Sequence, residues 1–231
     1  MTEREKIFAR IREALTVQAP RPGLQDRDTA SLRPISKGAP AANAREWLPP
    51  VGDSFEDQLA CFRANAIDLK ATFHLANDRD DLAKLLLELR DVEGWKKVAS
   101  HRGELTDAAC QTLALPVCRT DQPFDASELE ACDAGITECD ALIAQTGSVL
   151  VTNRSAGGRA LSVLPPHHVV IARREQLLRD LPAAFELLKK KYAANYPSMI
   201  SFITGPSRTG DIERILVLGA HGPKKLTIFC V

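Results

Sequence analysis

The stretch KKVASHRGELTDAACQTLALPVCRT, residues 96–120, decides the fold class. KKVAS predicts a strand, GELTDAACQTLAL predicts a helix, and PVCRT predicts a second short extended segment. Strands that alternate with helices in this way are typical of an α/β sheet, in which parallel strands are joined by helices that cover the sheet. The stretch therefore predicts the α/β class.

The same alternation continues on both sides. Upstream, the pattern predicts a helix over residues 54–70, a short strand near Thr72, and a helix over RDDLAKLLLELRD that Asp78 or Asp80 can cap. Downstream, HHVVIA, SMISFIT and LTIFCV predict three further strands. Residues 174–193 predict a helix that Pro182 should kink or divide.

One pair of segments departs from this alternation. ALIA and SVLVT flank Gln145, Thr146 and Gly147, and a three-residue connection that contains glycine predicts an inserted β-hairpin. Thr146 and Ser148 offer hydroxyl groups there, and Gly147 lets the backbone approach a ligand. An ordinary tight turn accounts for the same residues equally well.

The chain divides into three parts. Residues 1–15 carry apolar side chains at helical spacing and predict an amphipathic helix that needs a partner surface. Residues 16–50 contain six prolines and no sustained apolar period, which indicates an arm or linker. Residues 51–231 are expected to form a single α/β domain.

Composition excludes several classes of function. The 231 residues carry no formal net charge and only 5% aromatic side chains, so we expect no nucleic-acid surface. No run approaches the roughly 18 to 20 apolar residues of a membrane span, and the charged N-terminus does not resemble a signal peptide. These features predict a soluble cytoplasmic protein.

The six cysteines are dispersed along the chain, without a C-x-x-C pair or a closely repeated spacing. Free buried thiols therefore explain them better than disulfides, a zinc site or an iron–sulfur cluster. We expect neither a metal nor a cofactor.

The stretch TGPSRTGDIERILVLGAHGP, residues 204–223, admits two interpretations. In the first, a strand ends at Gly205 and Pro206, and the hydroxyls that follow lie at the carboxyl end of a sheet, where open α/β sheets bind ligands. Arg208 would then be a bidentate partner for a carboxylate or phosphate. Under this interpretation the stretch is an anion-binding loop.

The second interpretation is structural. Ser207 or Thr209 caps a helix, and the acids Asp211 and Glu213 in its first turn complement the helix dipole. Because residues two positions apart diverge by about 200° on a helix, at most one of these acids can face a ligand. A nucleoside-triphosphate P-loop is excluded, since Asp211 and Ile212 occupy the lysine and hydroxyl positions of that motif.

Two further side chains are catalytic candidates. His221 lies in a glycine-containing turn, and imidazole suits proton transfer at physiological pH. Glu138 precedes the hairpin at a predicted strand end, where a carboxylate can act as a base or nucleophile. Both residues also fit purely structural roles.

The adjacent His167 and His168 should point to opposite faces of a strand, so we expect one to be packed and the other exposed, with no shared metal.

The stretch 204–223 resembles the C-terminal signature of the LUD domain, and the chain as a whole is similar to the lactate-utilization protein C family. AGITECDALIAQTGSVLV, residues 134–151, and LSVLPPHHVVIA, residues 161–172, support the resemblance, which runs from about Phe55 to Val231. It implies an α/β fold of the NagB/RpiA/CoA-transferase-like kind.

The resemblance also implies a role in oxidising L-lactate to pyruvate with two companion proteins, one of which carries iron–sulfur motifs. This chain would then be a non-redox subunit that binds a small carboxylate or phosphate, or that stabilises the assembly, with self-association into a homo-oligomer left open. Two alternatives are a free-standing enzyme acting on a phosphorylated or CoA-linked metabolite and an interaction or regulatory protein. Whether the chain itself catalyses a reaction stays open.

Carried over position by position, the resemblance marks as site positions, without assigning roles, Thr146, Gly147, residues 205–209, Asp211, Glu213, His221 and Gly222. Ser148 and Glu138 are added for their own hydroxyl and carboxylate groups, which gives two sets of candidates. The ligand-binding set is Thr146, Gly147, Ser148, Gly205, Pro206, Ser207, Arg208, Thr209 and Gly222. The catalytic candidates are His221, Glu138, Asp211 and Glu213. Gln145 stands where family members often have an acid, so a catalytic base at that position would be missing here.

Overall fold

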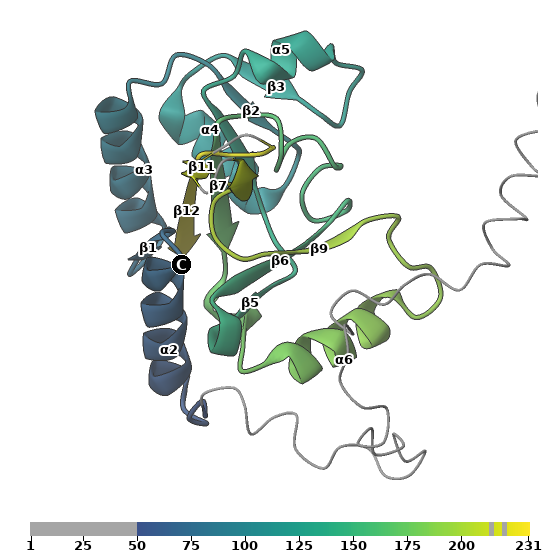
Figure 1. Ribbon diagram of the computed structural model, residues 1–231. Coiled ribbons are helices and arrows are strands. Elements are labelled where there is room, and N and C mark those ends of the chain that lie inside the picture. The colour runs from purple at the N-terminus through teal and green to yellow at the C-terminus, as the bar shows by residue number, and fades with distance from the viewer. Residues whose placement is uncertain (1–49, 213–214, 219–220) are drawn as a thin grey trace, which may run out of the picture. The chain divides into compact units, whose positions relative to one another are not determined.

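The computed structural model describes residues 50–212, 215–218 and 221–231 (Figure 1). The amphipathic helix expected over residues 1–15 and nearly all of the arm over residues 16–50 lie outside the described residues. The described helices are α2 (Phe55–Asp68), α3 (Arg79–Glu93), α4 (Glu104–Leu113), α5 (Ala126–Glu130) and α6 (Leu181–Tyr192), with short 3-10 turns η3 (Ala144–Thr146) and η4 (Arg174–Gln176).

Six parallel strands form the main sheet, in the order β1-β12-β7-β4-β2-β3. The strands are β1 (Thr72–Leu75), β12 (Lys225–Cys230), β7 (His167–Ala172), β4 (Ala134–Thr137), β2 (Val98–Ser100) and β3 (Val117–Arg119). The α/β class predicted from residues 96–120 is confirmed, because that stretch forms β2, α4 and β3. The last strand of the sequence, β12, lies between β1 and β7.

The predicted hairpin forms β5 (Ala141–Ile143) and β6 (Ser148–Thr152), which pair antiparallel around residues 144–147. Its strands do not enter the parallel sheet. They join β8 (Leu177–Leu178) and β9 (Ile200–Ile203) in a second sheet of order β8-β5-β6-β9.

Both sheets are buried by helices. On one face of the main sheet, α3 and α4 pack through apolar side chains such as Leu82, Leu86 and Leu105. On the other face, Phe62 of α2 and Val149 of β6 belong to the same core cluster as strands β1, β7 and β12. Helix α6 covers the far side of the second sheet. The second sheet therefore lies between the main sheet and α6 (Figure 1).

Local signals explain the helix boundaries. Asp78 begins α3 by accepting a hydrogen bond from the Asp81 N–H at 2.8 Å, and Gly94 ends it with a φ of 68°. Asp180 caps α6, and Pro182 lies in its first turn, where a missing N–H costs nothing. Pro182 therefore divides the predicted helix over residues 174–193 into η4, β8 and α6, which is one of its two expected effects.

The structural interpretation predicted a helix within residues 204–223, and that prediction is wrong. Residues 208–212 and 215–218 form the antiparallel strands β10 (Arg208–Ile212) and β11 (Ile215–Leu218), and Glu213 lies outside the described residues. ILVL is a four-residue apolar run of largely β-branched and aliphatic residues, which is too short to distinguish a strand from a buried helix by periodicity. The possible capping residues Ser207 and Thr209 before this run were the reason for predicting a helix.

Candidate functional site

A pocket of about 240 Å³ lies where the loop after β9 meets the loop before β12. It collects five predicted site residues from these two loops: Gly205, Pro206, Ser207, His221 and Gly222. Residues from two loops that are separated in sequence thus form one site.

The pocket does not lie at the carboxyl edge of the parallel sheet, where the ligand interpretation placed it. The strand before its first loop, β9, belongs to the second sheet. Its inner wall includes His168 and Leu226, the second residues of β7 and β12. The pocket is therefore next to the amino ends of these parallel strands.

The two loops are hydrogen-bonded to each other. Ser207 of the first loop donates its N–H to the carbonyl of Pro223 in the second loop at 2.9 Å. Lys224 of the second loop donates its N–H to the carbonyl of Pro166, just before β7, at 2.8 Å. A Cβ atom added to Gly222 would lie 3.2 Å from the Ser207 Cβ, so a side chain there would push the loops apart. These contacts fix the shape of the pocket mouth.

Arg208 holds the first loop in place and does not line the pocket. Its guanidinium donates to the carbonyl of Leu69, the C-terminal cap of α2. A cation at the carbonyl end of a helix is favoured by the helix dipole. Gly205 makes this close approach to α2 feasible with a φ of 88°, a conformation that favours glycine.

The hairpin residues divide into two groups. The Ser148 Oγ lies 2.8 Å from the Thr204 Oγ1, and Thr204 lines the pocket, so Ser148 supports the site from behind. Thr146 and Gly147 lie instead against α2. The Asn65 side chain donates to the carbonyl of residue 144 at 2.9 Å, and a Cβ on Gly147 would come within 2.8 Å of the Asn65 Cβ.

His168 and its neighbour His167 are both buried, with 1% and 4% of their surface exposed. The expectation that one of them is exposed is wrong, because β7 is an inner strand with both faces covered. Burial lowers the pKa of His168 to about 3 and that of His167 to about 4. Both imidazoles are therefore neutral at physiological pH.

The described lining is partly polar and partly apolar. It combines the hydroxyl side chains of Ser162, Ser201, Thr204 and Ser207 with apolar side chains such as Val163, Met199 and Phe202, and it contains no carboxylate, lysine or arginine. The imidazole of His221 is at the exposed mouth. Such a lining suits a small ligand with both a hydrogen-bonding end and an apolar end.

Glu138 is not part of the described pocket lining and follows β4 directly, at the carboxyl end of that strand. Its Oε1 accepts the Leu105 N–H at 2.9 Å, in the first turn of α4. The residue in the capping position, Gly103, has no side chain that could do this. Glu138, which follows β4, thus caps a helix that follows β2. The backbone N–H of Glu138 in turn donates to the His101 Nε2 at 3.3 Å.

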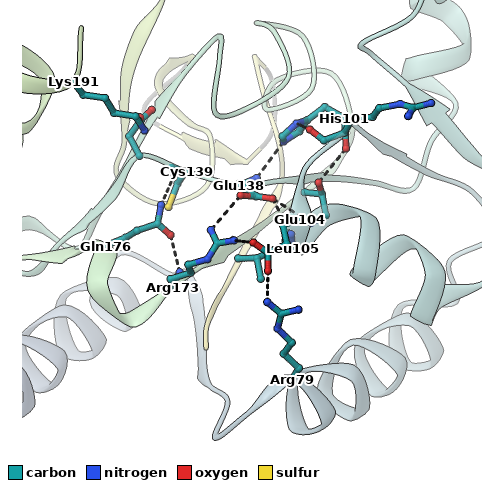
Figure 2. A network of polar contacts seen from close by, with 12 residues as sticks. Arg79, His101, Glu104, Leu105, Glu138, Cys139, Arg173, Gln176 and Lys191 are labelled. Atoms are coloured by element: carbon teal, nitrogen blue, oxygen red, sulfur yellow. Dashed lines mark hydrogen bonds and ion pairs between the residues drawn. The ribbon is translucent and has the colours of Figure 1, made fainter.

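The same edge carries a chain of ion pairs that the sequence interpretation missed. The Glu104 carboxylate contacts Arg79 and lies 2.7 Å from the Arg173 Nη2, and Arg173 also lies 3.5 Å from Glu138 (Figure 2). The hydrogen bond from Arg79, followed by that from Arg173, lowers the pKa of Glu104. His101 and Arg173 each follow a parallel strand directly, and that position was the signal available in the sequence.

Three predicted site residues have no described side-chain position. Thr209 and Asp211 lie in β10, where the structure describes the backbone, and Glu213 lies outside the described residues.

Within residues 50–212, 215–218 and 221–231, no three His, Cys, Asp or Glu side chains gather as metal ligands would. In the same ranges, no helix has the length and apolar character that crossing a membrane requires.

Comparison with known families settles the assignment suggested by residues 204–223. The model of the LUD domain matches residues 59–231. The chain belongs to the LUD domain family. A solved structure, of a DUF162 family protein from Deinococcus radiodurans, has the same fold, with a TM-score of 0.60 at 22% identity over 78% of this chain and 99% of that one. The predicted LUD resemblance is confirmed.

Curated relatives of this LUD domain protein carry the name Lactate utilization protein C. The protein from Deinococcus radiodurans is 31% identical over 121 residues, which cover 52% of this chain and 56% of the relative. The one from Halalkalibacterium halodurans is 38% identical over 96 residues, or 41% and 42% of the two chains. The chain thus spans about half the length of the curated relatives it matches.

Proposed function

We propose that this chain is a non-redox subunit of a system that oxidises L-lactate to pyruvate, and that its pocket binds a small carboxylate. Two observations support the proposal. Relatives in the LUD domain family are named for lactate utilization, and five motif residues from separate loops line one pocket of suitable size. The convergence of these loops carries the argument.

The lining fits a 2-hydroxy or 2-oxo acid. The apolar part of the wall, which includes Val163 and Met199, can receive the methyl group. The hydroxyls of Thr204 and Ser207 can donate to carboxylate or hydroxyl oxygens, and the imidazole of His221 at the mouth can add a further hydrogen bond. In this scheme the chain binds and orients the acid.

Partner proteins complete the proposed system. The redox centres belong to companion subunits, one of them an iron–sulfur protein, and the assembly works in the cytoplasm. Self-association of this chain into a homo-oligomer is part of the same hypothesis. Affinity purification of the tagged chain from lactate-grown cells tests it, since the companions should be recovered in fixed stoichiometry.

Binding to the pocket is tested by titration calorimetry of the full chain with L-lactate and pyruvate. Ser207→Ala and His221→Ala should each weaken binding by about tenfold, the equivalent of one lost charged or neutral hydrogen bond. Ser127→Ala, which removes an exposed hydroxyl on α5, is the control and should leave affinity unchanged. Unaltered binding in both pocket variants would show that the acid does not bind in this pocket. Normal growth on lactate of a strain that lacks the gene would show that the protein is not needed to oxidise lactate.

The described lining lacks a guanidinium or ammonium group, and a phosphate, with a charge of about −1.5 to −2, needs such a partner more than a singly charged carboxylate does. The alternative of an enzyme for phosphorylated or CoA-linked metabolites is therefore the less well supported. Inorganic phosphate and CoA in the same titrations distinguish the two ideas. Tighter binding of either than of lactate would favour the alternative.

A further inference from the structure

The inner wall of the pocket contains one polar side chain that the motifs did not identify. His168 lines the pocket from β7, beside Leu226 of β12, and only 1% of its surface is exposed. The other polar lining residues come from loops or from the second sheet. His168 is thus the polar group that the main sheet itself presents to the pocket.

The hydrogen bonds of His168 are half satisfied within the described structure. Its Nε2 lies 2.9 Å from the Thr137 Oγ1 on the neighbouring strand β4, which fixes the ring. Its Nδ1 is buried and has no hydrogen-bond partner among the described residues. Buried polar atoms are nearly always paired, so each exception calls for a physical reason.

His167 shows that an unpaired nitrogen alone does not mark a site. Its Nε2 lies 2.8 Å from the Thr227 Oγ1, and its Nδ1 also lacks a described partner. However, His167 points to the opposite face, where its ring meets Trp95 edge-on at 5.3 Å, and it is not part of the pocket lining. The two adjacent histidines therefore differ in position, because His168 is part of the pocket wall and His167 is not.

The chemistry of His168 is that of a neutral group. Burial, followed by the proximity of His167, lowers the pKa of His168 to about 3. A neutral imidazole donates or accepts one hydrogen bond at Nδ1, depending on the tautomer that Thr137 selects. It suits an uncharged hydroxyl or keto oxygen better than a carboxylate, whose natural place is at the exposed mouth near His221.

We propose that His168 is the specificity-determining residue of the pocket and that its Nδ1 hydrogen-bonds the oxygen on C2 of a 2-hydroxy or 2-oxo carboxylate. The proposal rests on the proposed function, because it assumes a carboxylate in this pocket. Thr137 is then a positioning residue that holds the ring, and Leu226 forms the apolar wall beside it.

The test compares ligands that differ only at C2. L-Lactate and pyruvate have an oxygen there, whereas propionate has none. The full chain should bind lactate at least about tenfold more tightly than propionate, since a site built to bond an oxygen rejects an analogue that lacks it. His168→Gln keeps a polar atom near the Nε2 position but removes Nδ1, so the preference should disappear. His168→Asn keeps a polar atom near Nδ1 and should retain part of it.

His167→Gln is the matched control and should leave the preference unchanged, with circular dichroism and Tm verifying the fold of each variant. If the wild-type chain binds lactate but His168→Gln keeps the full preference, the inference fails and the proposed function stands. If the wild-type chain binds none of the three acids, both fail. Two-bond ¹H–¹⁵N spectra of the wild type give an independent answer: lactate should shift the Nδ1 resonance of His168 and not that of His167, and an unmoved His168 resonance would overturn the inference.

Discussion

Gly103 and Glu138, which are distant in sequence, together form the N-terminal cap of α4. A Cβ atom on Gly103 would lie 2.4 Å from the Glu138 Oε1, so the absence of a side chain admits the carboxylate that caps the helix. The sequence suggested a catalytic base or nucleophile at Glu138, and that role stays a prediction. The observed contacts describe an acid occupied with backbone N–H groups and Arg173.

Replacement of Glu138 should therefore affect stability. Glu138→Ala should lower the free energy of unfolding by about 1 to 2 kcal/mol, because α4 loses its cap and Arg173 loses a partner. Urea denaturation measures the change. Glu130→Ala, at an exposed position in α5, is the control and should change it little. A variant of full stability that nevertheless abolishes lactate-dependent growth would restore the catalytic interpretation.

Asp140 should make stability depend on acid pH. Its side chain is fully buried and its Oδ1 lies 2.7 Å from the Lys191 Nζ and 2.6 Å from the Tyr192 hydroxyl. Burial alone raises the pKa of Asp140, but hydrogen bonds from Lys191, Ser155 and Tyr192 outweigh it and hold the pKa below its usual value.

Because the pKa of Asp140 is lower in the folded chain than in the unfolded one, its contribution is complete above the ordinary aspartate pKa of about 4 and is lost as the pH falls further. Asp140→Asn should thus lower stability at pH 7 and flatten the loss on acidification. Urea midpoints at pH 7, 5 and 3 provide the measurement. Parallel pH curves for the two proteins would rule out this role for Asp140.

At the scale of elements, the pattern of the sequence predicted five of the six strands of the main sheet and missed the inner strand β4. Buried parallel strands are continuous apolar runs, and HHVVIA and LTIFCV show this directly. The second sheet could not be predicted as a separate unit, because its pairings join residues that are distant in sequence, and β8 has only two residues.

The C-terminus of α2 and the pocket loop should be coupled through Arg208. Arg208→Ala leaves the Leu69 carbonyl without this donor, so amide exchange at residues 69–71 should accelerate and carboxylate affinity should fall a few-fold. Hydrogen exchange with mass spectrometry and calorimetry provide the two readouts. A large loss of affinity with unchanged exchange would instead indicate that Arg208 contacts the ligand directly.

For the molecule as a whole, the motif positions include five of the residues that line the pocket and miss the others. The loop residues around Ser207 and His221 were found because the family signature spans both loops. His168 was missed for a physical reason. Two adjacent histidines show only that they face opposite sides, and the sequence does not reveal that both sides are covered. Arg208 was assigned to an anion because its contact with Leu69 depends on tertiary structure.

The described core should also fold and bind without the first part of the chain. The LUD domain model matches only residues 59–231, and the described residues of the four core clusters and of the pocket lie between Val51 and Val231. A chain that begins at residue 50 should therefore keep its Tm and its affinity for lactate. If residues 1–49 bind companion proteins, the shortened chain should fail to recover them from lysate, whereas equal recovery would place that contact on the α/β domain.

Because β12 lies between β1 and β7, the first described strand of the domain pairs with the last one. The edge strand β1 is among the first parts of the domain to be synthesised, yet its neighbour in the sheet is the last strand to be made. Such long-range pairing slows folding and exposes unpaired strands in the interval. A nascent chain that stops before β12 therefore lacks both the strand that joins β1 to β7 and the Leu226 wall of its pocket, so β1 stays without its neighbour in the sheet until Cys230 has been made.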